Sequence, residues 1–446
     1  MFDQKAKIGI WGFGLVGESL VNYLSKQGCS DLLVYDLKPV DPSLYEHKFI
    51  FTSDLDWFLK ACDTILPSPG IDLEPYQEYQ AKFVAELDLF AQNWQGVVWA
   101  ITGTLGKTTL ASLLECLLNQ VGLKAIAAGN IGLPMLDILD QDDNLAVLEL
   151  SSFQLDLCQS FAPDLAVWTN FFPNHLDRHK TLGNYFLAKA KIFLRQTASQ
   201  IALLPISLIP ELIKFNLKIS SKLYFFGLKS ELNPENLNYI DQASQGVFIL
   251  QDEQVILLNK SGQSKIGDLA TLRAIDTYQI NLVILLAIIY LKKLEIPALF
   301  EFKPISHRVE QFLVTKNISW YNDSKSTVPQ ATLAAVHKLA GKPIILFLGG
   351  VSKGIDRTGL IQALKNRVKL VICFGGEASE LYQLCLEQNL TCAKFTHLES
   401  ALDYCMQVAQ SGDQVLFSPA GASFDLFKNY AERGDVFKRL VLAQCV

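Results

Sequence analysis

The segment 102–109 carries residues that can bind phosphate groups. It reads Thr-Gly-Thr-Leu-Gly-Lys-Thr-Thr and lies between an apolar run and a helix-forming pattern. In such a loop the backbone N–H groups cradle phosphate oxygens, the lysine neutralises the outer phosphates, and the following hydroxyl binds Mg²⁺. Lys107 and Thr108 hold these positions, so the segment predicts a site for the phosphates of ATP. It is a shortened variant, because the usual pattern has glycine where Ile101 stands.

Two further polar groups follow apolar runs downstream. Glu149 lies within the run 145–150, and because an unpaired charge is costly to bury, we expect a metal ion or a basic group beside it. Residues 174–179 follow the run 165–169 and place two imidazoles, an acid and an arginine within a short segment. On its own, that cluster is equally compatible with a polar turn that caps a helix.

A second glycine-rich turn, Gly-Phe-Gly-Leu-Val-Gly at residues 12–17, lies between a predicted strand and a predicted helix. Asp36 ends the next predicted strand. This spacing matches the dinucleotide-binding fingerprint, in which the backbone approaches a diphosphate at the helix N-terminus and the acid holds a ribose. A UDP diphosphate presents the same chemistry, so the pattern indicates a nucleotide or diphosphate without selecting one.

Polar loops also follow predicted strands in the last third of the chain, at 321–327 and 418–425. Paired glycines end two more predicted strands, at 349–350 and 375–376. Open α/β sheets bind ligands at the carboxyl ends of their strands, so we expect a ligand edge here. Each polar loop, taken alone, is also compatible with a helix cap.

Parallel sheets are needed to position these motifs. Short apolar runs alternate with helix-forming segments along all 446 residues, which is typical of β-α units and of several domains. The sequence predicts an α/β protein with three domains, each built on a mainly parallel sheet. They are an N-terminal Rossmann-like domain at 1–95, a central P-loop ATPase-like domain at 96–300 and a C-terminal Rossmann-like domain at 301–446.

The predicted elements place the motifs at strand ends. The expected strands are 7–11, 32–35, 97–102, 145–150, 165–169, 344–348, 370–374 and 414–418, and the expected helices include 18–27 and 107–121. We expect an irregular or antiparallel excursion at 233–265. The most apolar stretch, 280–291, is too short to span a bilayer and is predicted to form a buried helix.

Composition argues against several classes of function. The net charge is −6 and Lys and Arg are not clustered, which disfavours nucleic-acid binding. The nine cysteines are scattered without a Cys-x-x-Cys pair, which favours reduced cytosolic thiols over disulfides or zinc ligands. The N-terminal residues do not follow the plan of a signal peptide. We therefore expect a cytoplasmic monomer without a membrane segment that acts on small molecules.

Together these segments resemble the Mur ligases, and among them the D-glutamate-adding branch. Several rare strings occur in the family's order along nearly the whole chain. They are 103–109, Gly-Asn-Ile-Gly-Leu-Pro at 129–134, Leu-Glu-Leu-Ser-Ser-Phe-Gln-Leu at 148–155, Pro-Asn-His-Leu-Asp-Arg-His at 173–179, Asn-Asp-Ser-Lys-Ser-Thr at 322–327, and 418–434. The Asp-Asn-Pro-Arg string of the diaminopimelate- and lysine-adding relatives is absent, which favours D-glutamate.

The resemblance implies an acyl-phosphate mechanism. ATP would phosphorylate the carboxylate of UDP-N-acetylmuramoyl-L-alanine, and the amino group of D-glutamate would then displace phosphate. The catalytic residues carried over are Lys107, Glu149, His175 and Lys189. Thr108 and Glu149 would hold one Mg²⁺ and His175 a second, and Lys189 would be carbamylated to act as a carboxylate-like ligand. Lys191 competes for that assignment, and a solvated helix lysine is the alternative for Lys189.

The remaining binding residues are carried over in the same way. ATP is assigned to Gly103, Thr104, Leu105, Gly106, Lys107, Thr108, Thr109, Asn281, Arg308 and Asp323. The UDP substrate is assigned to Leu15, Val16, Asp36, Lys38, Gly70, Asn130, Ser151 and Gln154. D-Glutamate is assigned to Lys325, Thr327, Lys353, Ser423, Phe424 and Tyr430. Lys325 and Lys353 would match its two carboxylates.

Some positions depart from the residues usual in the family. Leu105 replaces Asn, Ser352 replaces Asp, Val16 replaces Thr, and Asp276-Thr277 replaces His-Asn. Another Mur ligase or a folylpolyglutamate synthetase-like ligase is the near alternative, although the folate enzyme generally lacks the N-terminal domain. A dinucleotide-dependent oxidoreductase is a distant alternative because it leaves 102–109 unexplained. A silent binding protein is disfavoured because the proposed cations and metal ligands are intact.

Overall fold

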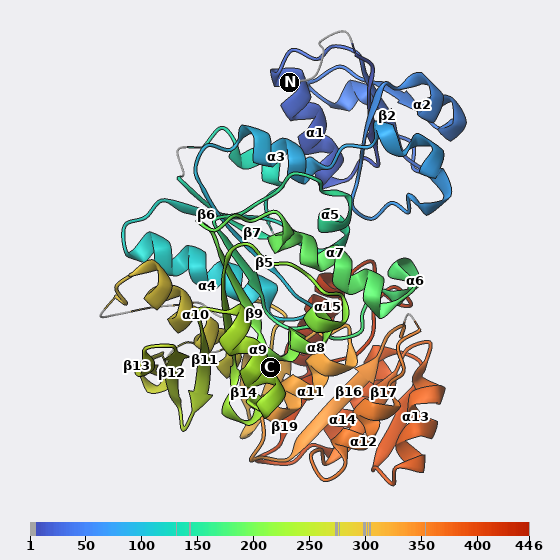
Figure 1. Ribbon diagram of the computed structural model, residues 1–446. Coiled ribbons are helices and arrows are strands. Elements are labelled where there is room, and N and C mark those ends of the chain that lie inside the picture. Colours follow the sequence, from blue (N-terminus) through green and yellow to red (C-terminus); the bar gives the residue numbers. More distant parts are fainter. Residues whose placement is uncertain are drawn as a thin grey trace. The chain divides into compact units, whose positions relative to one another are not determined.

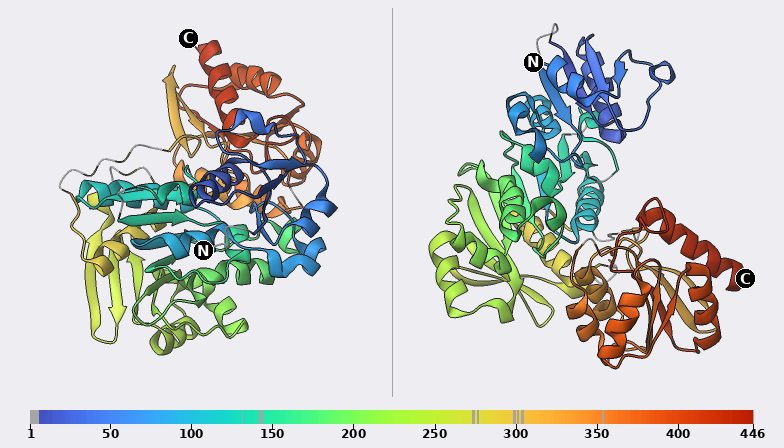
Figure 2. Two further views of the ribbon diagram at one scale, coloured as in Figure 1. Left: turned by 90° about the horizontal axis from the view of Figure 1, so that it is seen from above. Right: turned by 90° about the vertical axis from the view of Figure 1, so that its right-hand side faces the viewer.

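The structure is a computed structural model that describes residues 6–130, 132–141, 144–272, 275, 277–297, 300, 302, 305–352 and 354–445. The chain forms two compact units (Figures 1 and 2). The first unit comprises Met1–Phe171 and Thr181–Phe302, and the second comprises Phe172–Lys180 and Lys303–Val446.

The first unit begins with a parallel sheet in the order β3-β2-β1-β4. Its strands are β1 (Ile8–Trp11), β2 (Leu32–Tyr35), β3 (Ile50–Thr52) and β4 (Thr64–Pro67). Helix α1 (Leu15–Lys26) packs on one face and α2 (Leu55–Ala61) on the other. Strands β1 and β2 are buried along their whole length, as expected for a parallel sheet covered on both faces.

The second sheet of this unit has the order β13-β12-β11-β10-β9-β8-β5-β7-β6. Its strands are β5 (Val97–Thr102), β6 (Ala125–Gly129), β7 (Leu145–Glu149), β8 (Leu165–Trp168), β9 (Ile201–Pro205), β10 (Lys222–Leu228), β11 (Gly246–Gln251), β12 (Gln254–Asn259) and β13 (Gly262–Asp268). The strands from β6 to β11 are parallel, and β12 and β13 are antiparallel. The antiparallel excursion expected at 233–265 is therefore confirmed, although it begins with a regular helix, α9 (Pro234–Ala243).

Helices cover both faces of this second sheet (Figure 1). Helices α4 (Lys107–Gln120) and α10 (Gln279–Lys292) share one hydrophobic cluster with the sheet. Helices α5 (Ser152–Leu157), α7 (Leu182–Leu194) and α8 (Ile209–Lys214) contribute to the cluster on the other face. Helix α10 is the buried helix predicted at 280–291, and no helix among the described residues is long and apolar enough to cross a membrane.

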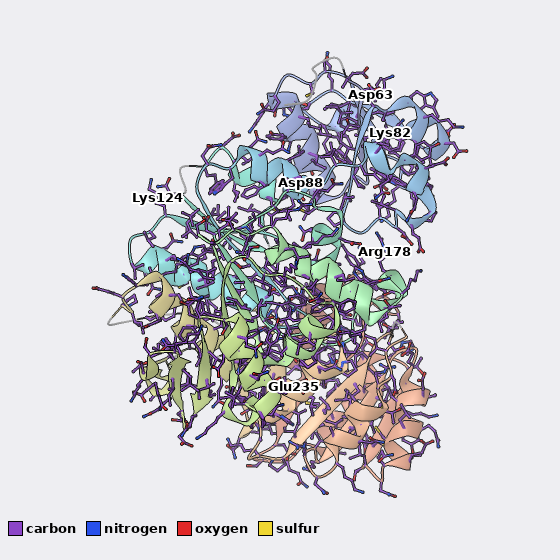
Figure 3. All side chains as sticks on the ribbon, in the orientation of Figure 1. Asp63, Lys82, Asp88, Lys124, Arg178 and Glu235 are labelled. Atoms are coloured by element: carbon purple, nitrogen blue, oxygen red, sulfur yellow. The ribbon has the colours of Figure 1, made fainter. Side chains whose placement is uncertain are left out.

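Helix α3 (Glu86–Asn93) joins the two sheets of the first unit. The buried carboxylate of Asp88, labelled in Figure 3, accepts hydrogen bonds from the backbone N–H of Ser160 (2.7 Å) and from its hydroxyl (2.6 Å). On α1, the hydroxyl of Ser19 donates to Asp137 (2.5 Å), which lies in a short 3-10 helix between β6 and β7. One hydrophobic cluster continues from the first sheet into the second, so these two sheets share a core.

The second unit contains a sheet in the order β14-β15-β19-β16-β17-β18, parallel except for the edge strand β14. Its strands are β14 (Glu310–Thr315), β15 (Ile318–Asn322), β16 (Ile344–Gly349), β17 (Leu370–Phe374), β18 (Cys392–Phe395) and β19 (Gln414–Phe417). One face is covered by α11 (Pro329–Lys338), α12 (Thr358–Leu364) and α13 (Ala378–Glu387), and the other by α14 (Leu398–Val408) and α15 (Tyr430–Cys445). The short helix α6 (Leu176–His179) also belongs to this unit.

The predicted fold class is confirmed, because the chain is α/β and contains three mainly parallel sheets. The predicted strands all form within a residue or two of the expected bounds. Helix α1 begins three residues before the expected position 18, because Gly14 already serves as its N-cap. The domain boundaries near 95 and 300 stay predictions.

Candidate active site

The segment 102–109 forms a tight loop between β5 and α4. Gly103 and Gly106 adopt positive φ angles of 143° and 80°, which favour glycine. A Cβ atom at Gly103 would lie 2.0 Å from Oγ1 of Thr169, so a side chain at that position would collide with the strand end next to it. The backbone N–H groups at the start of α4 are thereby aligned at the carboxyl edge of the sheet, where a phosphate can bind.

Residues after β8 hold this loop in shape. The N–H of Leu105 donates to Oδ1 of Asn170 (2.8 Å), and the carbonyl oxygen of Leu105 accepts from Oγ1 of Thr169 (2.6 Å) and Nδ2 of Asn170 (3.0 Å). These bonds use only the backbone of Leu105, so its departure from the usual Asn leaves the loop intact. Asn170 was not predicted from the sequence, because nothing local shows that it would contact a loop 65 residues away.

Lys107 and Lys189 converge on one atom of the loop. The Lys107 ammonium donates to the carbonyl oxygens of Gly103 (3.0 Å) and Thr104 (3.2 Å), and Nζ of Lys189 lies 2.8 Å from the same Gly103 oxygen. Lys189 is 1% exposed, and its Nζ also lies 4.9 Å from the centre of the Tyr185 ring. Burial and the charge of Lys107 hold the pKa of Lys189 well below its usual value, against the opposing influence of Glu149.

The competing residue Lys191 lies elsewhere. Its side chain is 38% exposed and contacts the carbonyl oxygen and the carboxylate of Asp156 on the surface of the first unit. Lys189 and Lys191 are two positions apart on α7, so the helix directs them to different sides. Of the two, Lys189 is the lysine that lies beside the phosphate loop, which is the segment 102–109.

Glu149 ends β7 next to the phosphate loop. It is 2% exposed, and its position is paired in register with Ile101 on one side and Gly129 on the other. The side-chain amide of Asn130 donates to Oε1 of Glu149 (2.8 Å). Lys107, Lys189 and Glu149 therefore gather around the carboxyl ends of β5 and β7, and Thr108 is the second residue of α4 at the same edge.

Three of the residues predicted to bind the UDP substrate also have structural roles. Ser151 and Gln154 form the capping box of α5, in which Oγ of Ser151 accepts from the Gln154 N–H (3.2 Å) and Oε1 of Gln154 accepts from the Ser151 N–H (2.9 Å). Asn130 is fixed by its bond to Glu149. These contacts set the orientation of polar groups that follow β6 and β7.

The glycine-rich turn at 12–17 is closed by Asp36. One carboxylate oxygen accepts from the N–H of Phe13 (2.7 Å) and the other from the N–H of Lys38 (2.8 Å). A Cβ at Gly17 would lie 2.1 Å from the Gly12 carbonyl oxygen, so glycine is required for this helix to approach the turn. The predicted residues Leu15, Val16, Lys38 and Gly70 all follow β1, β2 or β4 at their carboxyl ends, and Leu15 is 74% exposed.

Asn281 of α10 lies close to the phosphate loop. A Cβ at Gly106 would lie 3.1 Å from its Oδ1, and its Nδ2 donates to Oγ1 of Thr277 (3.0 Å). The other residues predicted to bind the nucleotide, Arg308 and Asp323, belong to the second unit. Asp323 is buried and accepts hydrogen bonds from Ser326 and Ser418 (2.6 Å each), and burial raises its pKa to about 6.

Most of the predicted amino-acid-binding residues lie at the carboxyl edge of the third sheet. The Lys325 ammonium lies 3.8 Å from the centre of the Tyr430 ring, a cation–π contact between two of the predicted residues. Ser423 is buried, whereas Phe424 is 66% exposed. Thr327 follows Lys325 in the loop after β15. Lys353 lies outside the described residues.

The loop after β16 is held by an acid that was not predicted from the sequence. Both carboxylate oxygens of Glu377 lie 3.1 Å from the N–H of Ser352, and Glu377 also forms an ion pair with the buried Arg357. Ser352 departs from the acid that the resemblance implies at this position, and the residue before α13, Glu377, accepts the hydrogen bond from its backbone N–H. No short-range pattern links positions 352 and 377.

His175 lies in the segment that belongs to the second unit. It has a left-handed backbone conformation with φ of 55° and forms the N-cap of α6. Its backbone N–H donates to Oδ1 of the adjacent Asn174 (2.9 Å). Its predicted place at a metal ion beside Glu149 stays a prediction.

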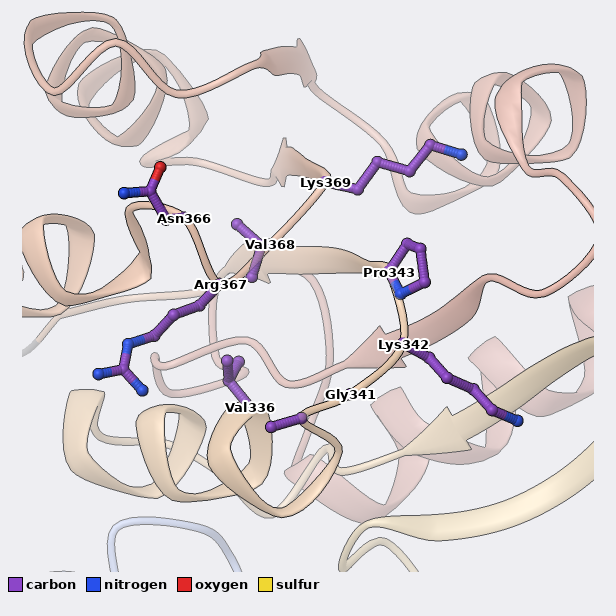
Figure 4. Close-up of a pocket in the computed structure, with 9 residues that line it drawn as sticks. Val336, Gly341, Lys342, Pro343, Asn366, Arg367, Val368 and Lys369 are labelled. Atoms are coloured by element: carbon purple, nitrogen blue, oxygen red, sulfur yellow. The ribbon is translucent and has the colours of Figure 1, made fainter.

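A cavity of about 450 Å³ lies at the opposite edge of the third sheet, at the amino ends of β16 and β17 (Figure 4). In Figure 4 the side chain of Arg367 extends to the left, whereas those of Lys342 and Lys369 both extend to the right. Lys369 is paired with Asp413 (2.6 Å). Because no predicted site residue lines this cavity, we do not assign it to the active site.

The chain is similar to known proteins along nearly its whole length. The Mur ligase middle domain matches residues 101–264, and the Mur ligase glutamate ligase domain matches residues 307–421. The chain is 31% identical to UDP-N-acetylmuramoylalanine--D-glutamate ligase of Caldanaerobacter subterraneus subsp. tengcongensis, covering 98% of both chains. It is 33% identical to the protein of the same name from Koribacter versatilis, covering 85% of this chain and 83% of that one.

A solved structure shares the fold. The MurF ligase of Thermotoga maritima in complex with ADP has a TM-score of 0.57 and 16% sequence identity, and the similarity covers 100% of this chain and 97% of that chain. The middle-domain match includes the phosphate loop and both of the lysines that converge on it. The chain belongs to the Mur ligases, a family of ATP-dependent ligases.

Proposed function

We propose that this enzyme joins D-glutamate to UDP-N-acetylmuramoyl-L-alanine in the cytoplasm, as a step in the synthesis of peptidoglycan precursors. ATP phosphorylates the substrate carboxylate, the amino group of D-glutamate attacks the acyl phosphate, and ADP and phosphate leave. The two relatives described above carry the name of this activity. We further propose that the enzyme acts as a monomer.

The observation that carries this proposal is the convergence of Lys107 and Lys189 on the Gly103 carbonyl oxygen, beside Glu149. A carboxylate and a triphosphate repel each other, so phosphoryl transfer between them needs positive charge at the transferring group. Lys107 supplies that charge at the N-terminus of α4, where the helix dipole adds to it. Its contacts with two loop carbonyls keep the ammonium close to the N–H groups that would bind phosphate.

The residues around the loop fit Mg²⁺. Glu149 offers a buried carboxylate and Thr108 a hydroxyl, and Mg²⁺ prefers such oxygen ligands together with phosphate oxygens and water. Bound Mg²⁺ would neutralise the phosphates and polarise the phosphoryl group. His175 is proposed to hold a second Mg²⁺, and the carbamate of Lys189 is proposed as a further carboxylate-like ligand for a divalent ion.

The environment of Lys189 supports its carbamylation. Its lowered pKa favours the neutral amine, which is the form that adds CO₂ to give a carbamate and a proton. The product is an anion, so it is attracted to the Lys107 ammonium, whereas a protonated Lys189 would be repelled by it. A carboxylate-like group then stands beside Glu149, where it can bind a hard divalent ion.

The amino-acid site is proposed to lie at the carboxyl edge of the third sheet. D-Glutamate brings two carboxylates, and Lys325 is held in place by the Tyr430 ring while its charge stays available. Lys353 would bind the other carboxylate. Ser423, Phe424 and Thr327 would complete the site.

The first sheet supports a UDP-linked substrate. The turn at 12–17, closed by Asp36, presents backbone N–H groups at the start of α1, where a diphosphate can bind. A folylpolyglutamate synthetase-like ligase has no evident use for this sheet. An oxidoreductase would leave the phosphate loop without a role.

A ligation assay tests the proposal. Purified enzyme is incubated with ATP, Mg²⁺ and UDP-N-acetylmuramoyl-L-alanine, and phosphate release is measured with D-glutamate, L-glutamate, L-lysine and meso-diaminopimelate in turn. We expect release only with D-glutamate. Equal release with L-lysine or meso-diaminopimelate would reject the specificity, and no release with any of them would indicate a binding protein.

A further inference from the structure

Arg433 is a fully buried cation beneath the proposed amino-acid site. It lies in the first turn of α15, is 0% exposed and is among the largest fully buried side chains of the protein. Burial lowers its pKa to about 10, which leaves it charged at neutral pH. A buried charge is costly, so its surroundings must stabilise it.

Its guanidinium group joins two loops that are far apart in the sequence. Nε donates to Oγ of Ser324 (3.0 Å) and Nη2 to the Ser324 carbonyl oxygen (2.7 Å), while Nη1 donates to the Gly421 carbonyl oxygen (2.9 Å). The Ser324 hydroxyl in turn donates to the carbonyl oxygen of Tyr430 (2.7 Å). The loop after β15, the loop after β19 and the start of α15 are therefore tied to one side chain.

A third loop packs against the same group. A Cβ at Gly350, which has φ of 71°, would lie 2.8 Å from Nη1 of Arg433 and 2.3 Å from the Ala422 carbonyl oxygen. The backbones of Val351 and Ala422 exchange two hydrogen bonds of 2.8 Å. The loop after β16 is thus held close to the guanidinium and to the loop after β19.

The charge of Arg433 is balanced mainly by neutral oxygens. In the described part of the chain its hydrogen bonds go to a hydroxyl and to carbonyl oxygens, and none goes to a carboxylate. The acids that influence it are Asp425 and Asp323, and Asp323 is itself engaged by Ser326 and Ser418. A positive charge buried here adds a favourable potential for an anionic ligand at the loops that Arg433 contacts.

We propose that Arg433 is a positioning residue for the amino-acid substrate. It fixes the three loops that carry Lys325, Ser423 and the segment around Ser352, and its charge favours a dicarboxylate over a neutral or cationic amino acid. This inference rests on the proposed function for the identity of the substrate. The role of Arg433 in holding the three loops together does not depend on the substrate, because it follows from the contacts of its guanidinium group.

Substitution by Lys keeps the charge and removes the planar set of donors. We expect Arg433→Lys to raise KM for the amino acid more than about tenfold, because buried carbonyl oxygens lose their donors, and to leave KM for the UDP substrate within about twofold. Arg433→Ala should lose more activity, and guanidinium at millimolar concentration should restore part of it, whereas methylammonium should not. Arg439→Ala is the matched control, since Arg439 is an exposed arginine on the same helix.

Hydrogen exchange provides a readout independent of turnover. In Arg433→Lys we expect faster exchange in 323–327 and 420–425, with exchange in 103–109 unchanged. Unchanged exchange in those two loops, or a parallel rise in KM for all three substrates, would overturn the proposal. If the wild-type enzyme uses another amino acid, the proposed specificity for D-glutamate is wrong. The positioning role of Arg433 is then tested by the same measurements with that amino acid. If Arg433→Ala does not fold, Arg433→Lys and its exchange pattern decide.

Discussion

Lys189 offers the sharpest test of the catalytic chemistry proposed for this ligase. In Lys189→Ala the carbamate can no longer form, and Nζ no longer lies against the Gly103 carbonyl oxygen (2.8 Å) and Oγ1 of Thr102 (3.3 Å). We expect the variant to bind ATP and to be nearly inactive. The matched control is Lys191→Ala, because Lys191 lies on the same helix with a 38% exposed side chain.

The expected size of the loss follows from the position of Lys189. The side chain is 1% exposed and its charge interactions are with Lys107 and Glu149, so a carbamate there would act directly at the metal and phosphate site. Removing one preorganised electrostatic group from such a site typically costs about 10²–10³ in kcat, or about 3–4 kcal/mol. Lys191→Ala should keep kcat within about twofold, since exposed positions contribute little.

Chemical rescue distinguishes a missing ligand from a damaged fold. Truncation to Ala leaves a buried space in which acetate can replace the carbamate. Phosphate release by Lys189→Ala is measured with increasing acetate, with chloride at the same ionic strength as the control, and thermal unfolding is recorded for each variant. Rescue by acetate and not by chloride is expected. Full activity of Lys189→Ala without acetate would show that no carbamate is needed, and equal losses in Lys189→Ala and Lys191→Ala would remove the distinction between the two lysines.

The other predictions concern charge and packing. Lys107→Ala should abolish phosphate release with little change in unfolding temperature, and unchanged turnover would reject its role. Burial raises the pKa of Glu86 to about 7 from 4.5, so its ionisation destabilises the folded state increasingly as the pH rises through that window, by up to roughly 3 kcal/mol. Glu86→Gln should therefore raise the unfolding temperature more at pH 8 than at pH 5, and the exposed Glu78→Gln should show no such difference. Gly103→Ala should impair ATP binding, because its Cβ would collide with Thr169 (2.0 Å), and a normal KM for ATP would contradict the need for glycine at this position.

The sequence predicted the sheets well because their signals are local. Runs such as those at β5, β7 and β16 are buried on both faces, so they are continuously apolar and easy to recognise. Motifs at the ends of these strands, including Lys107 and Glu149, could then be placed at one sheet edge from the β-α pattern alone. The start of α1 was expected too late, because the glycines before it carry no helix-forming signal.

The residues that hold the site together were not predictable in this way. Asn170 supports the phosphate loop from 65 positions away, Glu377 reaches Ser352 across 25 positions, and Arg433 reaches Ser324 across 109. Each is a single polar residue whose partner is a backbone group or a hydroxyl. Such contacts depend on tertiary packing, which no spacing rule in one sequence encodes.

The family resemblance was most useful where local reasoning was ambiguous. Without it, Lys189 is only one of two lysines on α7, and a solvated position was the favoured alternative. The structure buries Lys189 beside the phosphate loop and leaves Lys191 on the surface. The resemblance assigns the carbamate to Lys189, and the burial of this side chain supports that proposal.

The proposed mechanism requires that the phosphoryl group of ATP passes to the substrate carboxylate. This transfer can be followed by labelling both carboxylate oxygens of UDP-N-acetylmuramoyl-L-alanine with ¹⁸O and measuring the mass of the phosphate released during ligation. Transfer through an acyl phosphate predicts that each phosphate carries one ¹⁸O and that the new amide keeps the other. Unlabelled phosphate released in step with amide formation would contradict this mechanism.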